Sequence, residues 1–310
     1  MQRMEELTEK KMYHQPVLLK ESVEGLVWNP SGTYVDLTFG GGGHSREILE
    51  RLDENGRLLV FDQDPEAVAN AEGMNVTLVQ ANFRFLKRYL KLHGVSEVHG
   101  ILGDLGVSSH QFDIPDRGFS TRFEGPLDMR MDTVSGKTAR QVINEYKEGE
   151  LHRLLGMYGE VKNARSLAQA IASERVQKSI ETVEDLKRVL KRFTQKGREA
   201  KYYAQVFQAL RIEVNDEMAA LKEMLEQCVE VLMPKGRLVI ISYHSLEDRL
   251  VKNMMSKGSF SGEVTQDFYG NVLRPFRPIT KKPVVPSLEE VAVNNRARSA
   301  KLRIAERITD

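Results

Sequence analysis

The sequence has almost no cysteine, no long apolar run and almost no net charge. Cys228 is the single cysteine of 310 residues, so no disulfide can form within the chain and a zinc site built from several cysteines is excluded. No apolar run approaches the roughly 18 residues needed to span a membrane. The first residues are polar and charged, unlike a signal peptide. These absences predict a cytoplasmic protein.

The small net charge also limits what composition can say about partners. The formal charge is +1, so the chain as a whole does not have the charge of a nucleic-acid binder, and any such surface must come from local clustering. A hydrophobic content of 41% is enough for a large core and predicts two domains.

Four consecutive glycines are the most unusual feature that is present. Gly40 to Gly43 follow a strand predicted at 34–38 and precede a helix predicted to run through Leu52. Glycine allows positive φ and close approach of a ligand to the backbone, and the helix N-terminus offers unpaired N–H groups. The pattern predicts a nucleotide-like ligand on the first βα turn of a doubly wound sheet. A flexible turn without a ligand is the alternative.

The glycine run fits neither of two common phosphate-binding motifs. A P-loop requires Gly-Lys followed by Ser or Thr, which is absent here. In the dinucleotide motif, the third glycine position would be taken by Ser45 or Arg46, whose side chains obstruct close packing of helix on strand.

Polar residues close the next predicted strands. Asp62 follows 57–61, Asn82 and Phe83 follow 76–80, and Asp104 follows 98–103. The carboxyl ends of parallel strands meet at one edge of a sheet, where ligands bind. An acidic residue such as Asp62 can accept hydrogen bonds from ribose hydroxyls, a feature shared by NAD and S-adenosylmethionine (SAM) enzymes. Asp64 is the predicted helix N-cap, with Pro65 after it.

Together these motifs closely resemble the bacterial small-subunit ribosomal RNA methyltransferase H family, also called MraW. The blocks that carry the resemblance span nearly the whole chain, in order: HQPVL (14–18), DLTFGGGGHS (36–45), FDQDP (61–65), DLGVSSHQFDIPDRGFS (104–120), GPLDMRMD (125–132), QALRIEVNDE (208–217), SYHSLEDR (242–249) and NNRARSAKLR (294–303).

The resemblance implies an α/β fold of the class I SAM-dependent methyltransferases, with a Rossmann-like doubly wound sheet and an inserted all-helical domain. The methyltransferase domain would comprise 1–112 and 203–310, and the insert 113–202. The implied activity is methylation of the N4 amino group of a cytosine in the decoding region of 16S ribosomal RNA. SAM would be the cofactor and S-adenosylhomocysteine the product. The implied cofactor-binding residues are Gly42, Gly43, His44, Asp62, Phe83, Asp104 and Gln111.

The group that accepts the amino proton stays open. Many amino-methyltransferases carry Asn, Asp or Ser followed by Pro-Pro-aromatic after the fourth strand, whereas this chain has DLGVSS from Asp104. The candidates are Asp104, Ser108, Ser109, Tyr243 and His244. A structural role is an equal alternative for His244. The seven histidines form no HExxH pattern, so no metal is expected.

A basic segment predicts contact with RNA. Residues 187–203 hold seven basic residues, one acidic residue and three aromatic residues, Phe193, Tyr202 and Tyr203. Cations bind phosphates and aromatic rings can stack on unpaired bases. The alternative is a solvated helix face whose apolar residues belong to the core. The predicted RNA-binding residues are Lys187, Arg188, Lys191, Arg192, Lys196, Arg198 and Lys201. Further cations in the tail are Arg274, Arg277, Lys281, Lys282, Arg296, Arg298, Lys301 and Arg303.

Several further expectations concern organisation. Residues 106–132 show no periodicity and predict a lid over the ligand. Residues 203–232 predict one long helix, and 302–305 a final edge strand. The expected partner is small-subunit ribosomal RNA or the small ribosomal subunit, with no membrane, and monomer or homodimer stays open. The competing functions are methylation of a small molecule or protein, and a non-catalytic ribosome-assembly factor with a SAM pocket.

Overall fold

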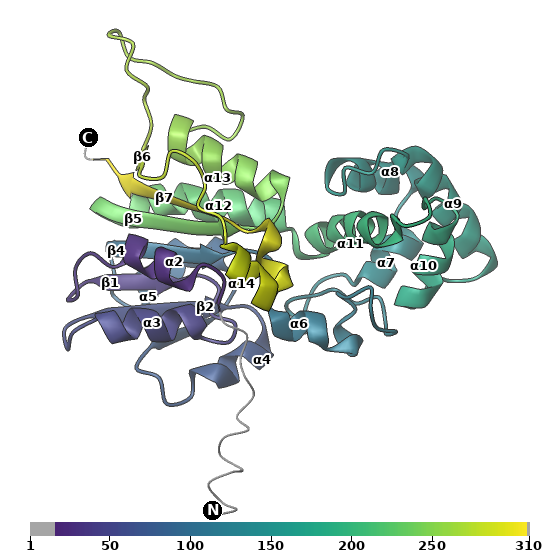
Figure 1. Ribbon diagram of the computed structural model, residues 1–310, viewed down its shortest axis with the longest axis horizontal. Coiled ribbons are helices and arrows are strands. Elements are labelled where there is room, and N and C mark those ends of the chain that lie inside the picture. Colours follow the sequence, from purple (N-terminus) through teal and green to yellow (C-terminus); the bar gives the residue numbers. More distant parts are fainter. Residues whose placement is uncertain (1–15, 309–310) are drawn as a thin grey trace, which may run out of the picture. The chain divides into compact units, whose positions relative to one another are not determined.

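The chain folds into two compact units, each described here by itself (Figure 1). The computed structural model describes residues 16–308, so His14 and Gln15 of the first motif lie outside the described residues. The first unit holds the described residues up to Gly106 and from Ala220 on, and the second runs from Val107 to Ala219. The predicted insert, 113–202, lies inside the second unit.

A seven-stranded sheet forms the centre of the first unit, in the order β3-β2-β1-β4-β5-β7-β6. The first five strands of this order are parallel, and β7 runs antiparallel to both of its neighbours. The predicted doubly wound α/β sheet is therefore confirmed. The strands are β1 (Thr33–Asp36), β2 (Arg57–Asp62), β3 (Thr77–Gln80), β4 (Val98–Asp104), β5 (Leu232–Ser242), β6 (Phe276–Pro278) and β7 (Lys301–Arg307).

The last strand was predicted at an edge, and that prediction is wrong. β7 pairs with β5 on one side and with β6 on the other, so β6 forms the edge. Four successive residues of β7 from Leu302 to Ala305 are buried, because both faces and both sides of this strand are covered. Sequence alternation over so few residues could not show the second neighbour.

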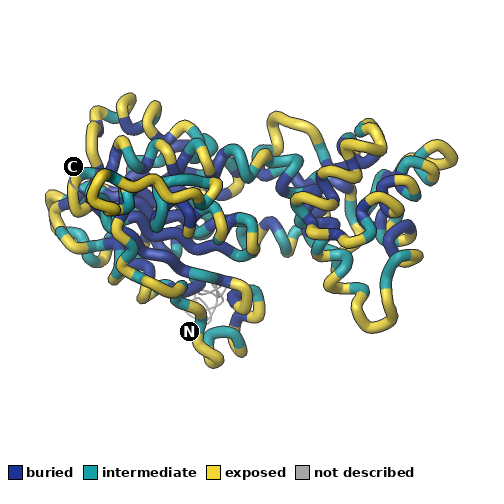
Figure 2. Tube along the Cα trace, turned by 90° about the horizontal axis from the view of Figure 1, so that it is seen from above, coloured by how far each residue is buried: buried dark blue, intermediate teal, exposed yellow. Residues whose placement is uncertain are grey.

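Short helices flank this sheet, and its strands form the buried centre of the unit (Figure 2). α2 packs against α3 and also contacts β4, β5 and β7. The helices of this unit are α2 (Leu19–Leu26), α3 (Gly43–Arg51), α4 (Pro65–Val68), α5 (Leu86–Leu92), α12 (Glu217–Val231, which begins in the second unit), α13 (Ser245–Lys257) and α14 (Leu288–Val293). Asp64 caps α4 with Pro65 at its first position, as predicted.

The second unit is helical and has its own core. Residues 106–132, predicted as a lid, contribute the buried side chains of Phe119, Leu127 and Met131 to that core. These three side chains are therefore structural, whereas Phe123 of the same segment is exposed. The helices are α6 (Ser109–Asp113), α7 (Ala139–Glu145), α8 (Glu148–Met157), α9 (Ala164–Gln177), α10 (Val183–Lys191) and α11 (Glu199–Asn215).

The long helix predicted over 203–232 is in fact two helices, α11 and α12. The break falls at Asp216, whose φ of 49° is left-handed and ends α11. The apolar spacing continues through the break, which is why the periodicity did not reveal it. An aspartate tolerates this conformation better than most side chains do.

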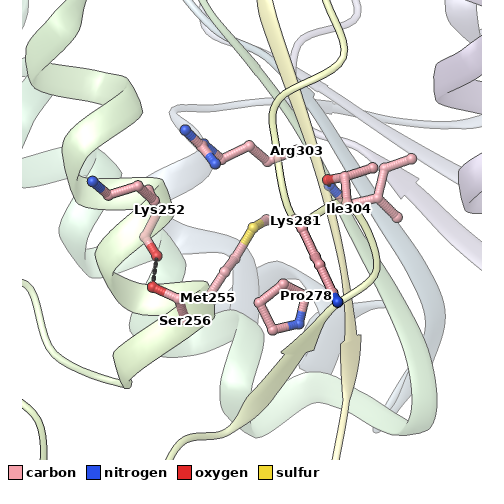
Figure 3. Close-up of a pocket in the computed structure, with 8 residues that line it drawn as sticks. Lys252, Met255, Ser256, Pro278, Lys281, Arg303 and Ile304 are labelled. Atoms are coloured by element: carbon pink, nitrogen blue, oxygen red, sulfur yellow. Dashed lines mark hydrogen bonds between the residues drawn. The ribbon is translucent and has the colours of Figure 1, made fainter.

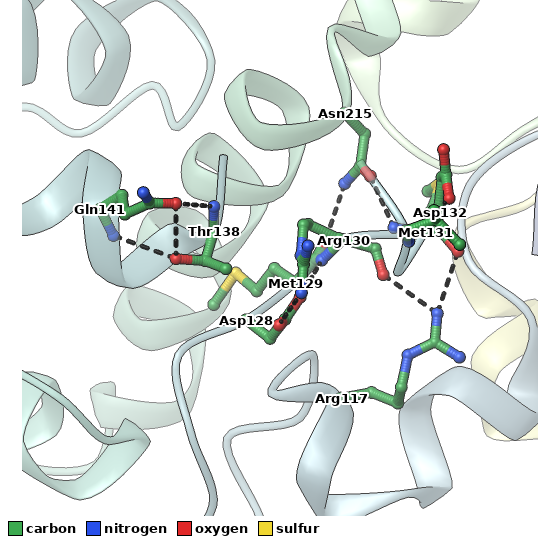
Figure 4. Close-up of polar contacts among 10 residues, drawn as sticks. Arg117, Asp128, Met129, Arg130, Met131, Asp132, Thr138, Gln141 and Asn215 are labelled. Atoms are coloured by element: carbon green, nitrogen blue, oxygen red, sulfur yellow. Dashed lines mark hydrogen bonds and ion pairs between the residues drawn. The ribbon is translucent and has the colours of Figure 1, made fainter. Parts of the chain in front are cut away.

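A group of polar contacts, here called the polar knot, joins the loops near the start of the helical unit to each other and to α11 (Figure 4). It consists of Arg117, Asp128, Arg130 and Asn215. Arg130 donates to Asp128 through Nε (2.9 Å) and a terminal nitrogen (2.8 Å). Buried Arg117 donates to the carbonyls of Arg130 and Met131, and Asn215 bonds both Met129 O and Met131 N. The GPLDMRMD motif is thus tied to the end of α11.

Candidate active site

The glycine run forms a tight turn from β1 into α3. Gly40 and Gly42 have φ of 50° and 73°, in the left-handed region that L side chains avoid. Gly42 is the N-cap of α3, and within residues 16–308 no side chain caps this helix. The first N–H groups of α3 therefore lack a side-chain acceptor, as the sequence predicted for a ligand-binding turn.

Gly43 is required for another reason. A Cβ at this position would lie 2.2 Å from Cγ of Pro16, so the residue permits close packing on the segment before α2. His44, the next residue, is buried and its Nε2–H donates to the carbonyl of Val17 (3.1 Å). The motifs at 14–18 and 36–45 are therefore linked by contacts of these two residues.

Asp62, at the end of β2, supports the turn from the neighbouring strand. Its two carboxylate oxygens accept hydrogen bonds from Gly40 N (2.8 Å) and Asp64 N (2.9 Å). Burial raises the pKa of Asp62 to about 6, and these backbone bonds oppose the rise. Each oxygen keeps a second lone pair, so the carboxylate can still accept hydroxyl groups of a ligand.

Asp36 is a site residue that sequence reasoning missed. It ends β1, it is buried, and its Oδ2 accepts a hydrogen bond from Ser45 Oγ (2.6 Å). Burial raises the pKa of this carboxyl. Thr38 Oγ1 accepts from Asp104 N (2.7 Å) and so joins the ends of β1 and β4. The signal used for Asp62, an acidic residue at the end of a strand, did not reveal Asp36, because the strand was predicted over 34–38 whereas β1 ends at Asp36.

Asp104, at the end of β4, meets side chains from two other elements. Its Oδ1 accepts a hydrogen bond from the hydroxyl of Tyr243 (2.8 Å), which follows β5. Its Oδ2 lies 3.9 Å from Nδ1 of His44. Burial raises the pKa of Asp104 to about 6, against the effects of His44 and Tyr243. Burial lowers the pKa of His44 and, with Asp104 nearby, raises that of Tyr243 well above its usual value.

Other predicted residues hold structural positions. His244 is the N-cap of α13, where its Nδ1 accepts from Glu247 N (3.4 Å) and its Nε2 lies 3.1 Å from Glu247 Oε1. Ser108 and Gln111 form the capping box of α6 in the helical unit, where Ser109 is the first residue of the helix. Phe83 is partly exposed and begins a short 3₁₀ turn after β3.

The predicted RNA-binding residues divide into two groups. Three of the seven are paired within the helical unit: Lys187 with Glu184, Arg188 with Asp185 and Arg192 with Glu174. The other four, for which residues 16–308 show no ion pair, are Lys191, Lys196, Arg198 and Lys201.

The aromatic side chains of this segment do not face solvent freely. Phe193, Tyr202 and Tyr203 pack against the core of the helical unit. The Tyr202 hydroxyl also donates to Asn163 (3.0 Å).

The charges at the sheet edge suit a cationic ligand with hydroxyl groups. Asp36, Asp62 and Asp104 are carboxyls with raised pKa values, and within residues 16–308 none of them has a Lys or Arg partner. A cation bound beside such a carboxyl would favour its ionised form. Hydroxyls could bond to Asp62, and ligand oxygens to the free N–H groups of α3.

Comparison with known proteins identifies the class of the site. A profile described as the MraW methylase family matches residues 11–308, nearly the whole chain. The chain belongs to the MraW methylase family. It is therefore a methyltransferase with the class I fold, and SAM is its methyl donor. The carboxyls and the glycine turn fit SAM, which carries a sulfonium, an amino group and ribose hydroxyls.

Curated relatives of this methyltransferase have similar length. The protein named ribosomal RNA small subunit methyltransferase H from Cytophaga hutchinsonii is 60% identical over 96% of this chain and 100% of its own. That of Flavobacterium johnsoniae is 56% identical over 96% and 98%. A solved rRNA methylase from Streptococcus thermophilus has 11% identity and a TM-score of 0.41, with 94% of each chain covered. No helix in the described part of the chain is long and apolar enough to cross a membrane.

Proposed function

We propose that this methyltransferase modifies the N4 amino group of a cytosine in the decoding region of small-subunit ribosomal RNA, in the cytoplasm. The names of its curated relatives support the RNA substrate. The observation that carries the proposal is the pair formed by Asp104 and Tyr243 at the sheet edge. When bound, SAM supplies an electrophilic methyl group on a sulfonium.

A cytosine amino group is a poor nucleophile, because its lone pair is conjugated with the ring. It becomes more reactive when an acceptor holds one of its N–H groups, and it must finally lose a proton. Asp104 suits both tasks. Its pKa of about 6 leaves it largely ionised at pH 7.5, yet close enough to that pH to take a proton.

Tyr243 positions this carboxylate. Its hydroxyl proton is donated to Oδ1 of Asp104, which fixes the orientation of the carboxylate and leaves Oδ2 without this hydrogen bond. The raised pKa of Tyr243 keeps the phenol protonated, which makes it a donor and excludes it as the base. His44 holds its Nε2–H on the carbonyl of Val17, and burial lowers the pKa of the ring, which makes Nδ1 a weaker base.

The other candidates fit the role of base less well. His244 and Ser108 have their side chains in the capping interactions of α13 and α6. A serine hydroxyl, as in Ser108 or Ser109, is also a much weaker base than a carboxylate, so we assign the acceptance of the amino proton to Asp104.

The test is methyl transfer from labelled SAM to small ribosomal subunits that lack the modification, with naked ribosomal RNA in parallel. Nuclease digestion and mass spectrometry would locate the label, which we expect on one cytosine N4. D104N should lower the rate about 100-fold, because an amide cannot take the proton. E97Q, which makes the same chemical change at an exposed carboxylate of the same unit, should be unaffected.

Three results would contradict the proposal or part of it. Label on another atom or on protein would assign a different substrate. SAM binding without label on either RNA would favour the assembly-factor function. If D104N kept the wild-type rate, Asp104 would not be the proton acceptor and the proposal for that residue would fail.

A further inference from the structure

A hairpin between α13 and β6 is left unexplained by the methyl-transfer site. The chain extends away from the helices and sheet of its own unit here and then returns to β6 (Figure 1). Gln266 and Val272 pair as an antiparallel bridge, and Leu273 N donates to Thr265 O (2.8 Å). We call residues 263–274 the arm.

The tip of the arm is built by one side chain. The Asp267 carboxylate accepts hydrogen bonds from Tyr269 N (2.8 Å), Asn271 N (2.9 Å) and Asn271 Nδ2 (2.9 Å). Gly270 has a φ of 83° and donates to Asp267 O (3.1 Å). The turn between the two sides of the arm is therefore well defined by hydrogen bonds.

This ordered turn carries two aromatic rings in solvent. Phe268 is 98% exposed and Tyr269 is 85% exposed. The rings contact each other edge to face, with centroids 5.7 Å apart. Two adjacent, nearly fully exposed rings contribute nothing to the core of this unit. Large apolar groups exposed in this way commonly mark an interaction site.

Basic side chains lie where the arm returns to the fold. A recess of about 40 Å³ is lined by Lys252 of α13, Lys281 after β6 and Arg303 of β7 (Figure 3). Arg303 is paired with Asp248 (2.7 Å). Lys252 and Lys281 are exposed, and residues 16–308 include no ion-pair partner for either of them. Their charges are available to an anion.

We propose that the arm is a contact for single-stranded RNA, with Phe268 and Tyr269 stacked on unpaired bases and Lys252 and Lys281 bound to phosphates. This inference rests on the proposed RNA substrate. Aromatic stacking combined with backbone neutralisation is how proteins commonly hold single strands. Neither ring was singled out by the sequence, because exposure decides their role.

The charges favour RNA over a protein or a second copy of the chain. The carboxylate of Asp267 stays negatively charged, because the hydrogen bonds within the turn lower its pKa, and the positive charges of Lys252 and Lys281 offset it. Lys252 and Lys281 have no acidic partner within residues 16–308, so they would repel the same basic surface of a second copy. A purely apolar partner would use the rings but leave these cations without a role.

The experiment measures binding of a labelled 12-nucleotide single-stranded RNA and of a duplex of the same length. F268A/Y269A should weaken binding of the single strand about tenfold or more and leave the duplex unchanged. F268L/Y269L keeps apolar volume without the aromatic face and should fail similarly. The control L288A/V293A removes two exposed apolar side chains of the same unit and should bind normally.

The salt dependence of RNA binding distinguishes the contribution of the two aromatic rings from that of the two lysines. K252A/K281A should reduce the slope of log affinity against log salt by about 1.4, since each phosphate contact on a single strand contributes about 0.7. F268A/Y269A should lower the affinity with the slope unchanged. A slope unaltered in K252A/K281A would overturn the role of these cations.

Three further outcomes would overturn the inference. Wild-type affinity in F268A/Y269A, or normal binding by F268L/Y269L, would exclude stacking. A change of oligomeric state in F268A/Y269A, seen by sedimentation, would assign the rings to a second copy. Methyl transfer by the wild-type protein is measured alongside. If the wild-type protein binds RNA but transfers no methyl group, only the proposed function is contradicted. If the wild-type protein transfers the methyl group and F268A/Y269A binds RNA as tightly as wild type, only the proposed role of the arm is contradicted.

Discussion

The sheet edge and the polar knot are both rich in charged and polar side chains, but these side chains are available to a ligand at the sheet edge and are bound to one another in the knot. At the sheet edge, Asp36, Asp62 and Asp104 have raised pKa values and no basic partner within the described residues. In the knot, Asp128 accepts hydrogen bonds from Nε and one terminal nitrogen of Arg130. The carboxyls of the first cluster stay available to a ligand, whereas Asp128 of the second is already bound to Arg130.

The difference shows why a specific motif need not be a site. DLTFGGGGHS and GPLDMRMD are equally distinctive in the sequence. The first leaves N–H groups and lone pairs unused at the ends of strands, and the second uses its polar groups to fix loop residues such as Met129, whose φ is 62°. A buried polar cluster that is internally satisfied rigidifies the fold.

The largest expected effect is on the knot. D128A removes the acceptor of three hydrogen bonds from Arg130 and should lower the free energy of unfolding of the helical unit by about 3 kcal/mol. Chemical denaturation followed by circular dichroism would measure it. D116A, an exposed aspartate of the same unit, is the control. If D128A unfolded with an unchanged free energy, the knot would not stabilise the fold, and it would no longer differ in role from the sheet edge.

The next effect is on cofactor binding. D62A should weaken SAM binding about 30-fold in calorimetry, because both the acceptor for ligand hydroxyls and the support of Gly40 are lost. D62N keeps one oxygen acceptor and should lose less. Stability should change little, since a buried carboxyl with a raised pKa is removed together with its bonds. If D62A lowered the free energy of unfolding more than the free energy of SAM binding, the role of Asp62 would be structural, like that of Asp128.

The third expected effect is a pH dependence. Asp62 and Asp104 have folded-state pKa values of about 6, above the ordinary 3.8, so folding favours their protonated forms. Their favourable effect on stability is complete below 3.8 and is lost as the pH rises through about 6. SAM affinity should move in the opposite direction and fall as the pH is lowered through about 6. A flat affinity profile from pH 5 to 8 would show that neither carboxylate is needed.

The smallest effect is expected for Y243F. The hydrogen bond from Tyr243 lowers the pKa of Asp104, so its removal should raise that pKa further. We expect a two- to fivefold loss of methyl transfer at pH 7.5 and an acid limb displaced to higher pH. Y89F changes a tyrosine of α5 in the same way and serves as the control. If the acid limb of the pH–rate profile were unchanged in Y243F, Tyr243 would not control the pKa of Asp104.

Much of the site could be predicted because its signals are local. A glycine run between a strand and a helix, and acidic residues at strand ends, place Gly42, Asp62 and Asp104 at one edge of a parallel sheet before any coordinates are known. Asp36 was missed, because the strand predicted over 34–38 placed it in the middle of the strand and not at its end. The reason for Gly43 was beyond the sequence, because it depends on Pro16, which is distant in the chain.

The sequence by itself determined the family, the doubly wound sheet and the capping of α4, since these follow from motifs and short-range patterns. Tertiary structure alone decided which aromatic residues are exposed. Phe193 and Tyr202 sit in a basic segment but pack on a core, while Phe268 and Tyr269 stand in solvent. It also placed β7 inside the sheet and broke the long helix at Asp216. Burial and strand neighbours depend on residues far away in the chain, and no local pattern contains them.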